Sequence, residues 1–573
     1  MDLPSTLVAL LAERARTQGA ERAYAFLNDR GVEEAALTCG ELYQAARALA
    51  ARLSTRAQRG DRALLVFPPG LEFVVAFFGC LLAGVIAVPM MMPRRNARDA
   101  SGAILANCEP VIALTTAAFT LRQDLLSRFE REGLQWLAVD LDDGATEGAE
   151  LPLPDPQAVA FLQYTSGSTS DPKGVAVTHA NLIANLEMIR LSYGNTPQST
   201  FLNWVPLYHD MGLILNALEP LYVGALCVLM APNGFMQRPL NWLRAIHHYK
   251  AEVTSSPNFG FDLCVARYRT ELMQDIDLSS WKVASVGAEP VRAETLRKFI
   301  DTFAAHGFRP EAMFPAYGMA EATLLITGGR RGAGHLTRSV SAAALQAHRV
   351  APPADAADTQ IVVGCGRALQ GEQIAIVDPE TRERLPLDRV GEIWVDGPNI
   401  ARVYWRNEAA TSAGLNAEIA GEDGATRWLR TGDLGFVDAT GELFVTGRIK
   451  ELIIIRGINH YPQDLERTVQ HLHPSLRENG GAAFSVPDES GEETLVVVQE
   501  IERTERNKVD PDELKGLIRE GITDQHEVFA RHIALIRPGT LPKTTSGKIQ
   551  RSLARKLWLD GRLEMLGGDR SAG

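Results

Sequence analysis

A loop rich in hydroxyl groups and glycine, 165–173, lies between two runs typical of β-strands, 159–164 and 174–178. Such a loop offers backbone N–H and side-chain O–H groups to phosphate oxygens, and Lys173 adds a positive charge. The Gly-x4-Gly-Lys-Ser/Thr spacing of a Walker loop is missing. The stretch therefore indicates a phosphate site of another kind, with a solvated Ser/Gly turn as the alternative.

Two further stretches could bind a ring or an acyl group. The run 203–213 reads Asn-Trp-Val-Pro-Leu-Tyr-His-Asp-Met-Gly-Leu, and its His209 could be a base, a substrate-orienting group or a satisfied core histidine. Gly287 and Ala288 follow an apolar run, so a planar ring could approach the backbone there. Glu289 is predicted to begin the next helix.

Two carboxylates stand in polar turns. The run 315–323 is predicted to be a turn that leads into a helix, in which Tyr317 offers a flat ring and Glu321 a hard oxygen for Mg²⁺. The alternative is an exposed glutamate at a helix start. Asp433 follows a glycine in the run 430–436, where its carboxylate could accept from two ribose hydroxyls at once. The alternative there is an Asp-containing hairpin turn.

The last polar stretch, 541–551, repeats the chemistry of the first loop, with hydroxyls and glycine before Lys548. Its alternative is a solvated basic turn. The run 446–452, Thr-Gly-Arg-Ile-Lys-Glu-Leu, lies at the predicted junction of two lobes.

Alternating strands and helices predict an α/β architecture in a large N-terminal domain, 1–448, followed by a small α+β domain at 449–573. Helices are expected at 7–18, 40–53 (with Thr38 as a cap), 71–82 and 181–191, and strands at 61–67, 85–88, 111–115 and 134–140. Short strands dominate 361–445 and predict a β-rich lobe. For the Gly/Arg- and Ala/Pro-rich segment 328–358, a mobile connection and a functional insertion remain open.

The composition is that of a globular protein with several lobes: 573 residues, 46% hydrophobic and 22% charged. A net charge of −12 argues against general attraction to nucleic acid or anionic membranes. We expect no signal peptide and no membrane insertion. The six scattered cysteines form no CxxC pair and are expected to be small buried hydrophobes in a reducing cytoplasm.

In this order and spacing, the stretches resemble the adenylate-forming superfamily of acyl-CoA synthetases, peptide-synthetase adenylation domains and luciferases. The matching runs are Tyr-Thr-Ser-Gly-Ser-Thr-Ser-Asp-Pro-Lys-Gly, Tyr-Gly-Met-Ala-Glu, Thr-Gly-Asp, Gly-Arg-Ile-Lys and Ser-Gly-Lys. Within this superfamily the sequence resembles fatty acyl-AMP ligases in particular. The stretches that carry this likeness are 204–213, 317–324, 453–464 and the extra segment after Thr327. One departure is Ser170, where the superfamily usually has glycine and where a positive φ would strain serine.

The resemblance implies that ATP and Mg²⁺ are used to convert a medium- or long-chain fatty acid to an acyl-adenylate and pyrophosphate. By the same resemblance, phosphate contacts fall to Thr165, Ser166, Gly167, Ser168, Thr169 and Lys173. Adenine contacts fall to Gly287, Ala288, Glu289, Tyr317, Gly318, Met319 and Ala320. Glu321 and Thr169 are implied to bind Mg²⁺. Asp433 is implied to bind the ribose, with Arg448 nearby. His209 is implied between the acyl pocket and the carboxylate, Lys548 as the bridge from carboxylate to α-phosphate, and Lys450 as the hinge between domains.

The acyl tunnel and the acyl acceptor are the least local features. Apolar residues are expected to line the tunnel, with ordinary core packing as the alternative: Tyr208, Met211, Ile214, Phe235, Met236, Trp242, Phe259 and Phe261. The resemblance implies a separate holo acyl carrier protein as acceptor, and a basic patch for it is sought among Lys543, Lys548, Arg551, Arg555 and Lys556. It also suggests that the insertion at 328–360 limits the domain rotation needed to use coenzyme A. A long-chain acyl-CoA ligase and a catalytically silent adenylate-binding protein are the rival hypotheses.

Overall fold

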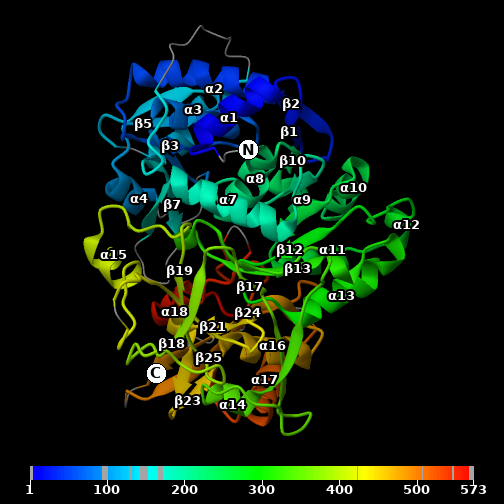
Figure 1. Ribbon diagram of the computed structural model, residues 1–573. Coiled ribbons are helices and arrows are strands. Elements are labelled where there is room, and N and C mark those ends of the chain that lie inside the picture. The colour runs from blue at the N-terminus through cyan, green and yellow to red at the C-terminus, as the bar shows by residue number, and fades with distance from the viewer. Residues whose placement is uncertain are drawn as a thin grey trace.

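The computed structural model (Figure 1) is a mixed α/β protein with several sheets. It describes residues 4–92, 101–129, 131–141, 152–165, 172–422, 424–488, 491–505, 508–544 and 547–566. The N-terminal elements occupy the top of the view in Figure 1, and the C-terminal elements, orange to red, the bottom.

The first sheet has six strands in the order β6-β5-β3-β4-β7-β8, and all pairs except β7–β8 are parallel. Its strands are β3 (Arg62–Leu65), β4 (Ile86–Pro89), β5 (Ile112–Thr115), β6 (Gln135–Ala138), β7 (Val159–Thr165) and β8 (Lys173–Thr178). The predicted strands are confirmed to within two residues. So are helices α1 (Leu7–Thr17), α2 (Cys39–Ser54), α3 (Glu72–Ala83) and α7 (His179–Tyr193). Thr38 caps α2 in a complete capping box with Glu41.

A second sheet of nine strands has the order β17-β14-β13-β12-β11-β9-β10-β1-β2. Its strands are β1 (Arg22–Leu27), β2 (Glu33–Thr38), β9 (Thr200–Asn203), β10 (Leu226–Met230), β11 (Val253–Ser256), β12 (Val283–Val286), β13 (Met313–Gly318), β14 (Leu325–Gly328) and β17 (Arg367–Ala368). The helices that follow these strands include α10 (Leu240–Tyr249), α11 (Asn258–Ala266) and α13 (Ala293–Phe303). One large apolar core packs residues of both sheets with these helices.

The predicted β-rich region is confirmed as a four-stranded antiparallel sheet. Its strands are β18 (Gln373–Val377), β19 (Gly391–Asp396), β20 (Leu429–Val437) and β21 (Leu443–Arg448). The segment 328–358 is not a structureless connection. It contains β15 (Thr337–Ser341) and α14 (Ala342–Gln346), and β15 pairs with β16 (Thr359–Val363) because both present apolar residues to a small core.

Beyond residue 449, strand and helix alternate again, as predicted. The elements are β22 (Ile453–Ile455), β23 (Ile458–His460), α16 (Pro462–Leu472), β24 (Leu476–Pro487), β25 (Glu493–Ile501), α17 (Pro511–His526), β26 (Ala530–Ile536) and α18 (Arg551–Leu559). Two apolar clusters are built entirely from this part of the chain, one on each side of the β24-β25-β26 sheet. The C-terminal lobe therefore has cores of its own.

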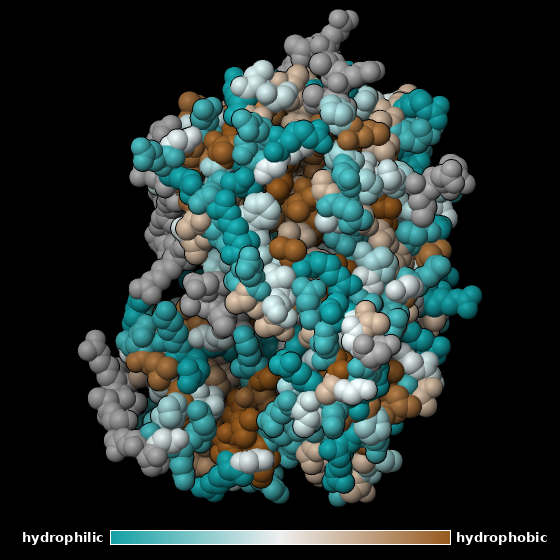
Figure 2. Space-filling model, turned by 60° about the vertical axis from the view of Figure 1, so that its left-hand side comes forward, coloured by the Kyte–Doolittle hydropathy of each residue, from teal (hydrophilic) through white to brown (hydrophobic). Residues whose placement is uncertain are grey.

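The cysteines lie in the interior, and the face of the molecule in Figure 2 is mostly polar. All six cysteines are free and buried, as predicted. On the face in Figure 2 most side chains are hydrophilic, and apolar ones reach the surface only in limited areas. Among the described residues, no helix combines the length and the apolar character needed to cross a membrane.

Candidate functional site

Three polar side chains from separate strands meet in one cluster, in which Tyr317 and Asp433 are buried and Arg448 is half-buried. Tyr317, near the end of β13, donates its hydroxyl to Asp433 Oδ2 at 2.9 Å. Arg448, which pairs with Asp433 across β20–β21, donates from Nε to Asp433 Oδ1 at 2.6 Å. The carboxylate is the main reason that the pKa of Arg448 is raised, while burial raises that of Tyr317. The cluster thus holds the Asp433 carboxyl group between a permanent cation and a phenol that stays protonated.

The turn that follows Tyr317 was predicted to be helical, and this was wrong. Residues 313–318 form a strand that pairs with β12 and β14, and a single 3₁₀ turn, Ala320–Ala322, follows. The turn ends at Thr323, whose φ of 64° and ψ of −62° form a γ-turn of the rarer, strained hand, with Leu324 N–H bonded to Ala322 O at 2.7 Å. Thr323 is locked by its hydroxyl, which donates to Asn399 O at 2.6 Å.

This turn carries Glu321, which is buried and not an exposed helix-start residue. Tyr404 donates its hydroxyl to Glu321 Oε1 at 2.8 Å. Burial raises the pKa of Glu321, and the hydrogen bond from Tyr404 opposes that shift. The aromatic ring of Tyr404 contacts a cation, because Lys173 Nζ lies 4.9 Å from the ring centroid. One tyrosine therefore contacts both an anionic and a cationic candidate residue.

Tyr404 belongs to a segment that ties these two residues together through the backbone. Ala176 N–H donates to Val403 O at 3.0 Å, and Trp405 N–H donates to Gly174 O at 2.7 Å, so the segment adds to the edge of β8. At its other end, Ala401 N–H donates to Glu321 O at 2.9 Å. Sequence reasoning missed Tyr404, because its partners lie far away in the chain and no local motif marks it.

The first loop is confirmed as the connection of an antiparallel hairpin, in which Thr165 pairs with Lys173. Lys173 begins β8 and lies against the ring of Tyr404. The predicted phosphate contacts Ser166, Gly167, Ser168 and Thr169, and the departure at Ser170, lie outside the described residues.

The predicted adenine border, 287–289, follows β12 as a loop. Glu289 does not begin a helix, because α13 starts at Ala293. Ala288 has a φ of 66°, and a Cβ at Gly287 would come within 2.9 Å of Ala316 O. Only glycine therefore allows this loop to lie so close to the backbone of β13, next to Tyr317.

His209 contacts Asp210, with 2.6 Å between Nδ1 and Oδ1. Burial alone would lower the pKa of His209, but the Asp210 carboxylate outweighs it and the net shift is upward. Asp210 also accepts from Met211 N–H at 2.7 Å and caps the π-helix Met211–Leu218. Such short π-helices are frequent at functional sites.

Lys548 reaches into this region from the C-terminal lobe. Burial lowers the pKa of its ammonium group, Arg448 lowers it further, and Glu451 and Asp433 raise it. The positive charge of Lys548 in turn lowers the pKa of His209. Lys548 is thus close enough to act electrostatically on Arg448, Asp433 and His209, so both lobes contribute to one site.

The predicted tunnel residues divide into several groups. Phe235 stacks on Trp204 with 3.8 Å between ring centroids, and Phe259 meets Trp204 edge-on at 5.6 Å. Met211 and Ile214 are buried on the π-helix, and Tyr208 is half-buried with its carbonyl accepting from Gln163. Trp242 and Phe261 are fully buried in an aromatic core with Trp281, and Met236 is 52% exposed. Trp242 and Phe261 thus pack in the core and Met236 faces solvent, while the tunnel itself stays a prediction.

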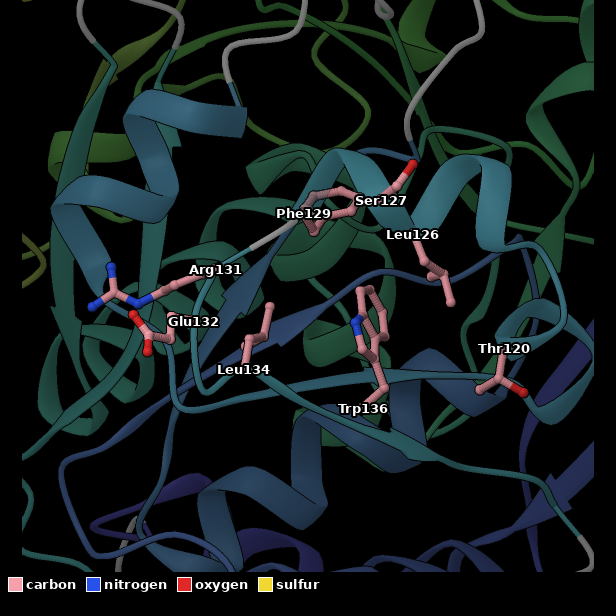
Figure 3. A pocket seen from close by; sticks show the side chains of 8 residues that line it. All are labelled: Thr120, Leu126, Ser127, Phe129, Arg131, Glu132, Leu134 and Trp136. Carbon is pink, nitrogen blue, oxygen red and sulfur yellow. The ribbon is translucent and has the colours of Figure 1, made fainter.

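The C-terminal basic residues differ in exposure: Arg551 is paired with Glu466 and Glu451, Lys548 is half-buried, and Lys556 is exposed. The basic patch for a carrier protein stays a prediction. The hollow in Figure 3 lies beside β6, where Phe129, Leu134 and Trp136 line it. None of the residues expected at the nucleotide line that hollow.

Comparisons with known proteins agree with this geometry. A family model for AMP-binding enzymes matches residues 11–405, and one for the AMP domain of Disco-interacting protein 2-like proteins matches residues 450–567. The chain therefore belongs to the AMP-binding enzyme family. It is 43% identical to the medium-chain fatty acid–acyl carrier protein ligase JamA of Moorena producens, over 98% of this chain and 96% of that one.

Solved structures show the same likeness. A fatty acyl-adenylate ligase of L. pneumophila in complex with acyl adenylate and pyrophosphate is 39% identical, with a TM-score of 0.74 over 97% of this chain and 96% of that one. A structure from a study of such ligases of E. coli and L. pneumophila is 31% identical, with a TM-score of 0.86 over 98% of both chains. The expected fold class is confirmed, and the family makes the chain an ATP-dependent adenylate-forming enzyme.

Proposed function

We propose that this chain joins a medium- or long-chain fatty acid to AMP, with release of pyrophosphate, and then passes the acyl group to the phosphopantetheine arm of a separate acyl carrier protein. The observation that carries the proposal is the hydrogen-bonded cluster of Tyr317, Asp433 and Arg448, with Lys548 of the C-terminal lobe near enough to interact with it electrostatically. The names of the relatives support fatty acids as substrates and a carrier protein as acceptor.

In this proposal Asp433 accepts from the ribose hydroxyls. Each of its oxygens already accepts one hydrogen bond, from Tyr317 or Arg448, and each carboxylate oxygen has a second acceptor site. The ring of Tyr317, held by its own hydroxyl, stacks on adenine, and Gly287, Ala288 and Glu289 border the base together with Gly318, Met319 and Ala320.

In this proposal the phosphates and Mg²⁺ bind near Tyr404. Tyr404 orients the Glu321 carboxylate through Oε1, and a carboxylate oxygen suits a hard cation. Mg²⁺ commonly uses one or two carboxylates together with substrate phosphates, so Glu321 with Thr169 is a chemically sufficient set. The bound ion would neutralise charge on the leaving pyrophosphate. Thr165, Ser166, Gly167, Ser168, Thr169 and Lys173 hold the β- and γ-phosphates.

The chemical step brings two anions together. A carboxylate oxygen of the fatty acid attacks the α-phosphorus, the bond from that phosphorus to the bridging oxygen breaks, and pyrophosphate leaves. Positioning and charge stabilisation account for catalysis of this kind. Lys548 bridges the carboxylate and the α-phosphate, and His209 orients the carboxylate at the entrance to a pocket formed by Tyr208, Met211, Ile214, Phe235 and Phe259.

The two lobes are proposed to act as domains, 1–448 and 449–573, with Lys450 as the hinge. Lys450 lies in the exposed 3₁₀ turn Ile449–Glu451 directly after β21, where a few backbone angles could absorb a rotation. The six buried, free cysteines support a location in a reducing cytoplasm.

The insertion at 328–360 is proposed to limit this rotation and so to disfavour coenzyme A. Two contacts with the C-terminal lobe support the idea. Asn459 Nδ2 donates to Gln346 O at 2.7 Å, and Gln360 Nε2 donates to Asp464 Oδ2 at 3.0 Å. Removal of 329–358 should therefore raise acyl-CoA formation, and rapid acyl-CoA formation by the intact chain would contradict the proposal.

The function is tested by incubating the protein with ATP, Mg²⁺ and a panel of acids, and weighing the products by mass spectrometry. Adenylates of medium or long fatty acids and release of pyrophosphate are expected, followed by acylation of a phosphopantetheinylated carrier protein. Efficient transfer to free coenzyme A would favour an acyl-CoA ligase, and binding of ATP without pyrophosphate release would favour a silent adenylate-binding protein.

A further inference from the structure

The C-terminal lobe contacts the N-terminal lobe beside α11 through three polar side chains. Arg292 donates from Nη2 to Asp262 Oδ2 at 2.8 Å and from Nη1 to Asn479 Oδ1 at 2.5 Å. Asn479 donates from Nδ2 to the same oxygen of Asp262 at 3.2 Å. Each side chain thus bonds to the other two, and the ring spans both lobes, because Asn479 lies in β24 and the other two residues precede residue 449.

Both halves of this ring are held in place by their own lobes. Asn479 has a φ of 54°, a left-handed conformation that asparagine tolerates better than most residues, and its N–H donates to Gln470 Oε1 at 2.9 Å. On the opposite side, Arg292 N–H donates to Asn258 Oδ1 at 3.1 Å. The backbone at Asn479 and at Arg292 is therefore fixed by its own lobe, which favours the contribution of these residues to closure.

Helix α11 contacts the C-terminal lobe at a second point. Phe259 lies one helical turn before Asp262, at the i, i+3 spacing that places two residues on one side of a helix. A Cβ at Gly547 would lie 2.6 Å from a ring carbon of Phe259, so the segment that carries Lys548 rests against that ring. The polar ring and Lys548 are thus supported by the same helix.

We propose that Asp262, Arg292 and Asn479 form an interlobe latch, which holds the C-terminal lobe in the orientation that places Lys548 in the adenylation site. The three residues are positioning residues, since they act through Lys548. The inference rests on the proposed function of that lysine. The latch favours the step that needs Lys548 in place and contributes nothing to a later step that proceeds after the lobe has moved.

Neighbouring ion pairs between the lobes are of a different kind. Lys298 lies 3.2 Å from Glu478, and His471 lies 3.5 Å from Glu294. Glu478 is 59% exposed, whereas the side chain of Asp262 is only 17% exposed. Exposed pairs contribute little to stability because water and salt screen them. Glu478, next to Asn479 in the chain, therefore provides a matched control.

The test compares the adenylation rates of Asn479→Gly and Glu478→Gln. The rate is measured as pyrophosphate release at saturating ATP and fatty acid. Glycine keeps the left-handed backbone and removes only the side chain. Loss of hydrogen bonds to charged partners predicts a fall of about tenfold or more in kcat for Asn479→Gly, with little change in KM for ATP. Glu478→Gln should stay within about twofold of the wild type.

A second measurement separates the latch from a general loss of structure. Amide hydrogen exchange of α11 should rise in Asn479→Gly, while that of the core strand β25 stays unchanged. Transfer to the carrier protein from added synthetic acyl-adenylate should not slow. A global rise in exchange, or an equal loss in both half-reactions, would indicate a merely structural residue and overturn the proposal.

Arg292→Gln approaches the latch from the other lobe and covers the case in which Asn479→Gly folds poorly. Its effect on kcat should match that of Asn479→Gly, and the double variant should lose no more than either single variant, because both break one ring. Wild-type adenylation by Arg292→Gln, or fully additive losses, would refute the latch. A wild-type protein that forms no adenylate would instead refute the proposed function.

Discussion

The contact between Tyr404 and Glu321 allows a sharp test of the phosphate side of the site. Tyr404→Phe removes one hydroxyl and keeps the ring that faces Lys173. Burial raises the pKa of Tyr404, so in the native enzyme its hydroxyl donates at every working pH. The 2.8 Å bond goes to a buried carboxylate, and a hydrogen bond to a charged group contributes about 1.5–3 kcal/mol. The variant should therefore lose about 10- to 150-fold in kcat/KM for Mg²⁺-dependent adenylation.

The assay is ATP–pyrophosphate exchange measured over a range of Mg²⁺ concentrations. If Tyr404 orients Glu321 toward the ion, the Tyr404→Phe variant should need more Mg²⁺ for half-maximal exchange, and excess Mg²⁺ should restore part of the rate. Tyr404→Leu also removes the ring and should weaken ATP binding further through Lys173. An unchanged Mg²⁺ requirement in Tyr404→Phe would refute the reasoning, and unchanged melting would exclude unfolding as the cause of a loss.

Three further predictions concern charged groups. Lys548→Ala should lose about 10²–10³ in kcat for adenylation while ATP still binds by calorimetry; near-wild-type adenylation would remove Lys548 from the mechanism. Because burial lowers the pKa of Lys548, kcat/KM should fall on the alkaline side below the ordinary lysine range, and Lys548→Arg should lack that fall in its pH profile. Burial raises the pKa of Glu372 to about 8, and its partner Asn399 donates to it at 2.7 Å. A raised carboxyl pKa stabilises the fold at low pH, and this contribution, about 4 kcal/mol, is lost as pH rises from the unfolded value toward 8. Thermal melting of the wild type should decline over that range and that of Glu372→Gln should stay level; parallel curves would contradict the assignment.

Features specified by neighbouring residues were predictable from the sequence. The capping box at Thr38 and the hairpin of β7 and β8 depend on residue types within a few positions of each other, and the structure has both. The alternation of strands and helices in both lobes was predictable too, because it follows from the local periodicity of apolar residues. The family resemblance then supplied the order in which such elements carry a nucleotide site.

Features specified by distant residues were not predictable. The run around Glu321 contains Met, Ala and Glu, which favour helix, yet the pairing of β13 with β14 leaves these residues only a tight connection between the two strands. Arg551 looked like a free surface cation, but its partner Glu466 lies 85 residues away in the sequence. Tyr404 carries no local mark, since its role depends on contact with Glu321, 83 residues earlier.

The γ-turn at Thr323 has a consequence for biosynthesis. A β-branched residue at positive φ costs about 1–3 kcal/mol and persists only where surrounding contacts enforce it. The enforcing contact is the backbone of Asn399, which leaves the ribosome long after the strands on either side of the turn. A nascent chain can therefore assemble much of its first two sheets before the contact that holds the turn of Glu321 is able to form.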